Sequence, residues 1–371
     1  MRTISVIMPC HNRGRDLPRI LEAYDRQDTD VTFEVLAVDD ASVDDTFRIL
    51  SEYHAQTYVL RVERQDTNQG PAAARNRAIQ MAESPLVLFV GDDVLPEPDF
   101  VRRHLQVHRY QSDTASAVLG RVTWPDDMQQ NTLMAHIDGL GAQQFSYYYF
   151  QDGREYDFRH FYTANISVKR DLLLSVDHWF DTDFTYAAFE DTELAYRLAK
   201  HGLRIFYSSA PIGRHYHYHT VWTFASRQYR AGIMACVFER KHPGVIRRSF
   251  MAMPRRWRVI VPVARAYLAM RSRTTCASEY LEATALQLAS FYEWSPNHLL
   301  DKLYVGLLDY FWRKGVVDGS IGDPRTAKSI HDFLARRTLK PLLAGFIREA
   351  LHEGIPLPEG SAHASTGRLL A

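Results

Sequence analysis

Short apolar runs alternate with amphipathic segments over the first 120 residues of the chain. Aliphatic and aromatic residues nearly fill the runs 4–8, 33–38 and 86–90, a pattern typical of strands buried on both faces, and a weaker run covers 58–62. Apolar side chains recur at helical spacing in the segments between them, 16–27, 44–54, 71–82 and 99–110. This alternation predicts an α/β fold with a mostly parallel sheet flanked by helices.

The remainder of the chain has two parts with different patterns. Up to residue 250 it is mixed, with strands predicted at 117–122, 166–169 and 204–208, a helix at 191–201, and an irregular aromatic-rich stretch at 124–162. Further on, helical periodicity covers 275–298, 299–315 and 326–352. We therefore expect a helical C-terminal region over 251–371.

Composition narrows the class of protein. The 371 residues include 44 basic and 44 acidic side chains, so no nucleic-acid partner is indicated. Three scattered cysteines favour a reducing compartment over a disulfide scaffold. The first apolar run is too short for a secretion signal, and no window reaches the roughly 18 apolar residues of a membrane span. A cytoplasmic location is predicted, with any membrane contact peripheral, at the inner face.

Two adjacent carboxylates follow the strand predicted at 86–90. Asp92 and Asp93 would lie at the carboxyl edge of the sheet, where open α/β sheets bind ligands. Paired carboxylates there suit Mn²⁺ or Mg²⁺ bridging to a diphosphate. The alternative is a solvated turn, because Asp-Asp before Val-Leu-Pro-Glu-Pro is good turn chemistry.

Polar residues also follow the first two strands. Pro9, His11 and Asn12 end the first, and Asp40 follows the second. Parallel strands end at one edge, so a carboxylate there can accept the imide N–H of uracil or thymine, or hold a ribose hydroxyl. Asp44 is interpreted mainly as the N-cap of the next helix. Arg75, after the small residues 70–74, either meets a diphosphate or lies on a solvated helix face.

Taken together, these motifs resemble those of family 2 glycosyltransferases of the GT-A fold, over residues 3–240. The resemblance rests on Pro-x-His-Asn at 9–12, Val-Asp-Asp-Ala-Ser-x-Asp-x-Thr at 38–46, Asn-x-Gly-x-x-x-Ala-Arg-Asn at 68–76, and Glu-Asp at 190–191. It implies a catalytic domain over 1–250, with a nucleotide-binding half at 1–115 and an acceptor half at 116–250. It also implies a nucleotide-sugar donor, UDP-linked by default, with GDP- and dTDP-sugars open.

The resemblance implies roles for single residues. The donor base and ribose would face Pro9, His11, Asn12 and Asp40, and the donor phosphates would lie near Arg75. Asp92 and Asp93 match the Asp-x-Asp region, Asp92 on the donor and Asp93 as direct metal ligand. Gly91 stands where the family often has its first Asp, which leaves metal dependence open.

Glu190-Asp191 begins the helix predicted at 191–201. In the family this motif supplies the base, so Asp191 would take the acceptor proton during in-line displacement with inversion. The alternative is an acidic first turn favoured by the helix dipole. His215, His217 and His219 would share one face of a strand, and the family often has a metal-binding His near here. We prefer His217 to His215 and expect His219 to be structural.

Trp124 and the aromatic stretch 145–162 either shape a sugar site or, for most members, pack in the core. The basic segment 255–273 could lie on an anionic membrane, which suits a lipid-linked acceptor, although a packed helix with a solvated basic face is favoured. The expected activity is transfer to a glycan or lipid-linked acceptor, in cell-surface glycan or polysaccharide synthesis. The alternatives are a nucleotide-sugar-binding module without turnover and a sugar nucleotidyltransferase, although the loop after the first strand lacks the latter's Gly-rich, Lys-containing pattern.

Overall fold

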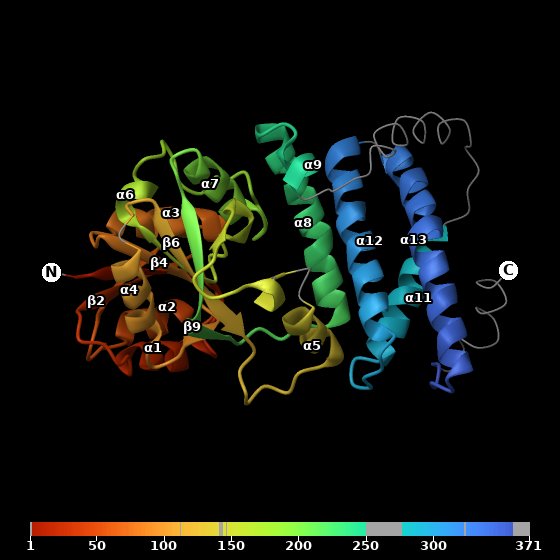
Figure 1. Ribbon diagram of the computed structural model, residues 1–371, viewed down its shortest axis with the longest axis horizontal. Helices are drawn as coiled ribbons and strands as arrows, with labels where there is room; N and C mark the ends of the chain where they lie inside the picture. Colours follow the sequence, from red (N-terminus) through yellow and green to blue (C-terminus); the bar gives the residue numbers. More distant parts are fainter. Residues whose placement is uncertain are drawn as a thin grey trace. The chain divides into compact units, whose positions relative to one another are not determined.

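The computed structural model describes residues 2–111, 113–140, 144–145, 147–249, 277–322 and 324–358. The chain forms two compact units (Figure 1). The first consists of Met1–Gln129 and Phe145–His217, and the second of Gln130–Gln144 and Tyr218–Ala371. The expected boundary between a catalytic domain and a helical region at residues 250 and 251 stays a prediction.

One mixed sheet organises the first unit. Its order is β3-β2-β1-β4-β8-β6-β9-β5, and β7 pairs with β9 off this path. The pairs β1–β2, β2–β3, β1–β4 and β6–β9 are parallel, whereas β8, β5 and β7 pair antiparallel to their neighbours. The strands are β1 (Ile4–Cys10), β2 (Phe33–Asp39), β3 (Val59–Arg64), β4 (Leu86–Val90), β5 (Val94–Pro96), β6 (Ser116–Thr123), β7 (Glu155–Tyr156), β8 (Asn165–Lys169) and β9 (Arg204–His215).

Helices cover both faces of this sheet (Figure 1). Side chains alternate along β1, so Ile4, Val6 and Met8 pack with α1, α2 and α4, while Ile7 packs on the other face with α3, α6 and α7. The predicted α/β fold is therefore confirmed. The helices are α1 (Leu17–Asp25), α2 (Thr46–Glu52), α3 (Gly70–Met81), α4 (Phe100–Tyr110), α6 (Arg170–Leu173) and α7 (Glu190–Ala199), with 3₁₀ turns at Tyr147–Tyr149 and Phe158–His160.

The second unit, as far as it is described, is helical. It contains α5 (Thr132–Gly139), α8 (Val221–Lys241), α9 (Val245–Ser249), α11 (Ala277–Phe291), α12 (Leu300–Ile321) and α13 (Pro324–His352). Thr220 caps α8 in a reciprocal capping box with Thr223. A Cβ at Gly315 of α12 would lie 1.9 Å from the Tyr229 carbonyl oxygen of α8, so α8 and α12 approach closely.

Some expectations need correction. Helix α8 was not predicted from the sequence, and the last strand, predicted to end at residue 208, continues for seven more residues to the end of β9. The predicted basic segment 255–273 lies outside the described residues. Among the residues that are described, no helix is both long and apolar enough to span a bilayer.

Candidate functional site

The carboxyl ends of β1, β2 and β4 form one edge of the sheet. Cys10 pairs with Asp39 across β1 and β2, and the Asp40 N–H donates to the Cys10 carbonyl at 2.8 Å. Two residues in these loops, Asn12 and Ala41, have a φ of 53°, and Phe189 before α7 has a φ of 69°. A left-handed conformation at a non-glycine residue costs about 1–3 kcal/mol and tends to cluster at functional sites.

Asp93 lies at the centre of a carboxylate–histidine cluster. Its Oδ2 is 3.2 Å from His215 Nε2 and 3.1 Å from His217 Nδ1. One ligand atom from each residue lies within 4.8 Å of the other two. Strand pairing explains the arrangement, because Val94 of β5 is the partner of His215 at the end of β9. The Tyr216 N–H also donates to the Asp93 carbonyl at 2.7 Å.

Gly91 leaves space for this carboxylate. A Cβ at position 91 would lie 2.5 Å from Asp93 Oδ1, well inside van der Waals contact. Position 91, where the family often has an Asp, must therefore lack a side chain if the Asp93 carboxylate is to keep its place. A side chain at 91 would have to displace the Asp93 carboxylate.

The two carboxyls differ in proton affinity. Burial, followed by the charge of Asp93, raises the pKa of Asp92 to about 7. Burial alone would also raise the pKa of Asp93, but the two histidines and Arg13 hold that pKa well below its usual range. Asp92 also accepts the His11 backbone N–H at 2.9 Å, which ties it to the end of β1.

Arg13 is a site residue that the sequence analysis missed. Its Nη2 donates to Asp93 Oδ2 at 2.8 Å and lies 3.2 Å from His217 Nδ1, while its Nε donates to Asp92 Oδ1 at 3.3 Å. The available signal was its position, directly after the His-Asn pair on the loop that faces these carboxylates.

The expected donor-binding residues lie on adjacent loops. Pro9 is in β1 opposite Val38. His11 Nδ1 is 2.8 Å from the Asp40 carbonyl oxygen, and Asn12 Oδ1 accepts the Val43 N–H at 2.9 Å. The Asp40 carboxylate accepts the backbone N–H groups of residues 69 and 70, both at 2.7 Å, so it secures the start of α3. Their contacts with a nucleotide stay a prediction.

Asp44 differs from its interpretation as an N-cap. The helix begins at Thr46, so Asp45 occupies the cap position. Asp44 instead accepts the N–H groups of Thr46 and Gly14, both at 3.0 Å, and thereby joins the loops after β2 and β1.

Arg75 pairs with Glu190 in the interior. Its Nη1 donates to Glu190 Oε1 at 2.9 Å, and the guanidinium lies 5.3 Å from the centre of the Phe180 ring. Within the described residues, Arg75 Nε and Glu190 Oε2 are buried without a hydrogen-bond partner. Arg75 lies five residues after Gly70, about 7.5 Å along the helix, so α3 connects the Asp40 loop to α7. Its predicted place near donor phosphates remains untested.

Asp191 occupies the first turn of α7. Its Oδ1 accepts the Thr192 N–H at 2.7 Å and the Thr192 hydroxyl at 3.2 Å. Burial, followed by the adjacent charge of Glu190, raises the pKa of Asp191 to about 7. A carboxylate with that pKa can accept a proton near neutral pH, as a general base must.

His219 and the aromatic residues have mainly structural surroundings. His219 belongs to the second unit, where its ring contacts Phe224 at 5.1 Å, and within the described part of the chain the group that could hold a metal consists of Asp93, His215 and His217 without it. Trp124 stacks on His215 with centroids 5.5 Å apart and planes at 9°. The aromatic stretch contributes Tyr147 and Phe161 to the buried core.

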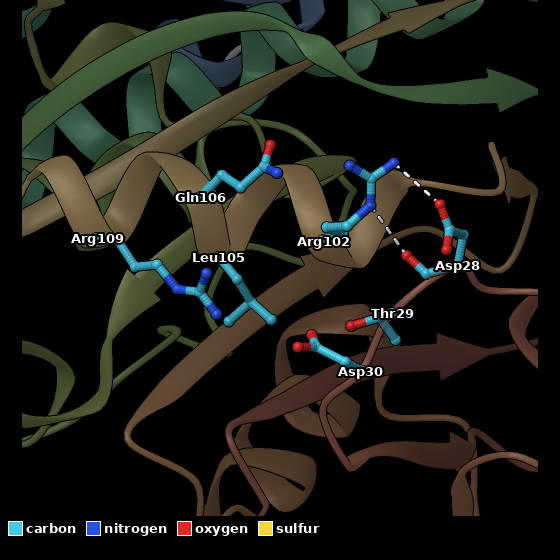
Figure 2. Close-up of a pocket in the computed structure, with 7 residues that line it drawn as sticks. All are labelled: Asp28, Thr29, Asp30, Arg102, Leu105, Gln106 and Arg109. Atoms are coloured by element: carbon cyan, nitrogen blue, oxygen red, sulfur yellow. Dashed lines mark hydrogen bonds and ion pairs between the residues drawn. The ribbon is translucent and has the colours of Figure 1, made fainter.

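A pocket of 310 Å³ is lined by none of the candidate site residues described above (Figure 2). It is formed by one side of α4 and by residues 28–30, which precede β2 at the amino edge of the sheet. Arg102 crosses it and donates to the Asp28 carboxylate at 3.1 Å.

Comparison with known proteins agrees with this geometry. The profile of the family described as Glycosyl transferase family 2 matches residues 5–174. Validoxylamine A glucosyltransferase of Streptomyces hygroscopicus subsp. jinggangensis is 28% identical over 293 residues, which are 68% of this chain and 64% of that protein. Residues 5–174 of this chain are therefore similar to the family 2 glycosyltransferases, and a named glucosyltransferase aligns over about two thirds of the chain. It spans less than two thirds of that relative's length.

Two further similarities are to named glycosyltransferases. The poly(ribitol-phosphate) beta-N-acetylglucosaminyltransferase TarS of Staphylococcus aureus is 39% identical over 95 residues, 25% of this chain and 16% of that protein. The mannosyltransferase PcManGT of Pyrobaculum calidifontis, solved with GDP-Man and Mn²⁺, matches with a TM-score of 0.54 and 17% identity, over 87% of this chain and 88% of that one. The structural match confirms the GT-A fold.

Proposed function

We propose that the chain is an inverting glycosyltransferase that moves a sugar from a nucleotide-diphosphate sugar to an acceptor hydroxyl. The observation that carries this proposal is that two carboxyl groups, Asp93 and Asp191, have pKa values shifted in opposite directions. Asp93 is held ionised beside two imidazoles, whereas Asp191 has a pKa of about 7. The first suits a cation that faces a diphosphate, and the second suits a base.

The ligand set at Asp93 fits a divalent transition ion. It combines one carboxylate oxygen with two imidazole nitrogens, Nε2 of His215 and Nδ1 of His217. Mg²⁺ prefers oxygen ligands alone, so this set favours Mn²⁺. When bound, such an ion would offset the negative charge that develops on the departing diphosphate. The mannosyltransferase PcManGT, which has the same fold, was itself solved with Mn²⁺.

The base acts at the sugar acceptor. As the acceptor oxygen bonds to the anomeric carbon, the bond from that carbon to the diphosphate oxygen breaks on the opposite face. The hydroxyl proton passes to the Asp191 carboxylate, which is worth roughly 10²–10⁴-fold in rate. Glu190 assists indirectly, since its charge raises the proton affinity of Asp191.

The donor and acceptor follow from the family and from the chemistry of the loops. We favour a UDP-sugar held by Pro9, His11, Asn12 and Asp40, with Asp92 and Arg75 toward the phosphates. The acceptor would be a glycan or a lipid-linked glycan in cell-surface polysaccharide synthesis, met in the cytoplasm or at the inner membrane face. Residues 1–250 would form the catalytic domain and 251–371 a helical accessory region.

The test combines ligand binding and turnover. Thermal stability is measured with UDP, GDP or dTDP, each with Mn²⁺ or with EDTA, because a ligand at 100 times its Kd stabilises by about 2.7 kcal/mol. We expect one nucleotide to raise the Tm only with Mn²⁺, and the matching nucleotide-sugar to be hydrolysed slowly. Binding without turnover would support a non-catalytic module. No shift with any nucleotide would refute the donor site.

A further inference from the structure

Three groups converge on one oxygen of the candidate metal site. Asp93 Oδ2 lies 2.8 Å from Arg13 Nη2, 3.1 Å from His217 Nδ1 and 3.2 Å from His215 Nε2. The same Arg13 Nη2 lies 3.2 Å from His217 Nδ1. The guanidinium therefore contacts two of the three residues that would hold the metal ion.

We propose that Arg13 is a built-in cation that competes with the divalent metal ion for Asp93, and that this competition couples metal binding to nucleotide binding. The proposal rests on the metal site of the proposed function. A dication bound by Asp93 Oδ2 and the histidine nitrogens would need the lone pairs that Arg13 now engages. Two cations sharing one carboxylate oxygen also repel each other. Metal binding must therefore release the guanidinium.

The loop is built so that the side chain of Arg13 can move while its backbone stays. The Arg13 N–H donates to Thr46 Oγ1 at 2.7 Å, and the preceding Asn12 is tied to residues 42 and 43. In contrast, the Arg13 side chain is 24% exposed, so it has a path to solvent from its place beside Asp93. Rotation about the side-chain bonds can release the carboxylates without unfolding the loop.

A released guanidinium would need a new partner, and a nucleoside diphosphate supplies one. Arginine presents a planar fork of donors that matches phosphate oxygens. When the diphosphate is present, the contacts that Arg13 loses at Asp92 and Asp93 are replaced. Metal without nucleotide should therefore bind weakly, and each ligand should strengthen the other by the same factor. Arg13 would thus help prevent the site from filling with metal before the donor arrives.

The experiment measures Mn²⁺ affinity directly, from the free Mn²⁺ signal in electron paramagnetic resonance, on the full chain. The variants are Arg13→Gln and, as a matched control, Arg15→Gln. Arg15 is an exposed residue on the same loop and makes no ion pair with Asp92 or Asp93 in the described part of the chain. Both variants remove one positive charge, but only the first removes the contacts with the carboxylates. Far-ultraviolet circular dichroism and the Tm establish that each variant is folded.

Without nucleotide, we expect Arg13→Gln to bind Mn²⁺ roughly tenfold or more tightly than the unmodified chain, and Arg15→Gln to stay within about twofold. Addition of UDP or GDP should tighten Mn²⁺ binding strongly in the unmodified chain and much less in Arg13→Gln. Arg13→Lys keeps the positive charge but loses the planar set of guanidinium donors. Its Mn²⁺ affinity should therefore lie between that of the unmodified chain and that of Arg13→Gln.

Two results would overturn the proposal in distinguishable ways. If Mn²⁺ binds the unmodified chain and folded Arg13→Gln equally, or binds the variant more weakly, the competition is wrong while the metal site stands. If neither the unmodified chain nor any of its variants binds Mn²⁺, with or without UDP or GDP, the metal site of the proposed function is wrong and the competition fails with it.

Discussion

The buried ion pair between Glu190 and Arg75 should affect stability and catalysis in different ways. The two side chains are 4% and 9% exposed, and the bond between them is 2.9 Å long. Glu190→Gln keeps the size of the side chain and one oxygen that can accept from Arg75, but it leaves the guanidinium charge buried without a counter-charge. Removal of one member of a buried pair costs about 3–5 kcal/mol, and the retained oxygen places this change near the lower end, at about 3 kcal/mol.

The loss should be visible in thermal unfolding. The first unit contains about 200 residues, a size at which each kcal/mol shifts the Tm by about 2–4 °C. Glu190→Gln should therefore lower the Tm by roughly 6–12 °C.

Although Glu190→Gln should lose stability, it should gain relative activity at low pH. After burial, the Glu190 charge is the main cause that raises the pKa of Asp191, so its removal should lower that pKa from about 7. A general base works only when deprotonated, and a lower pKa leaves more Asp191 deprotonated below pH 7. Activity below neutral pH, expressed as a fraction of the maximal activity at higher pH, should therefore increase. The acidic limb of the kcat/KM profile should move to lower pH in the variant. The assay is hydrolysis of whichever nucleotide-sugar is turned over, at temperatures well below both Tm values.

Glu193→Gln is the matched control. Glu193 is buried in the same turn of α7 and pairs with Arg197 at 2.8 Å, so this change also breaks an ion pair, one that is partly buried. Glu193 is not among the main causes of the shift in the Asp191 pKa, whereas Glu190 is second after burial. Glu193→Gln should lose stability without moving the acidic limb. If Glu190→Gln loses stability but its acidic limb stays in place or moves to higher pH, the electrostatic reasoning about Asp191 is refuted.

Four further substitutions test the base, the metal site and the packing of the helices. Asp191→Asn should lower kcat by about 10²–10⁴-fold while the Tm shift caused by the nucleotide persists, and loss of that shift would indicate a role in binding instead. Gly91→Ala would place a Cβ 2.5 Å from Asp93 Oδ1 and should weaken Mn²⁺ binding, as titration with the free ion would reveal. Gly315→Ala should cost about 1–3 kcal/mol in urea unfolding because of the close contact with α8, whereas Gly345→Ala, whose Cβ meets nothing within 4 Å, should gain about 0.5–1 kcal/mol. Equal effects of the two glycine changes would contradict the close packing.

The parallel half of the sheet was predictable because its signal is local. Strands buried on both faces are apolar at most positions, so β1, β2 and β4 could be located to within a few residues. Their common direction then placed the loops after them, including Asp40 and Asp92, at one edge. Two of the four motifs that carry the family resemblance, at 9–12 and 38–46, begin at these strand ends, so this part of the resemblance could be recognised from the sequence.

The long helix α8 was overlooked because its contacts favour small residues over a regular apolar stripe. Gly232 faces α12 so closely that a Cβ there would lie 2.1 Å from a backbone oxygen. Such a surface has little hydrophobic periodicity, although it packs tightly. Whether the segment forms a helix was therefore decided by its neighbours in the folded unit.

Local sequence determined where β1, β2 and β4 end, and therefore that Asp40, Gly91 and Asp92 lie at those strand ends. Only the tertiary structure decided which side chains meet. His217 reaches Asp93 across 124 positions because β9 continues to His215 and pairs with β5, and Arg75 meets Glu190 across 115 positions. Arg13 joins the same cluster because its loop faces the two carboxylates. The physical reason is that strand and helix formation depends on neighbours along the chain, whereas register, ion pairing and burial depend on contacts that exist only after the sheet has assembled.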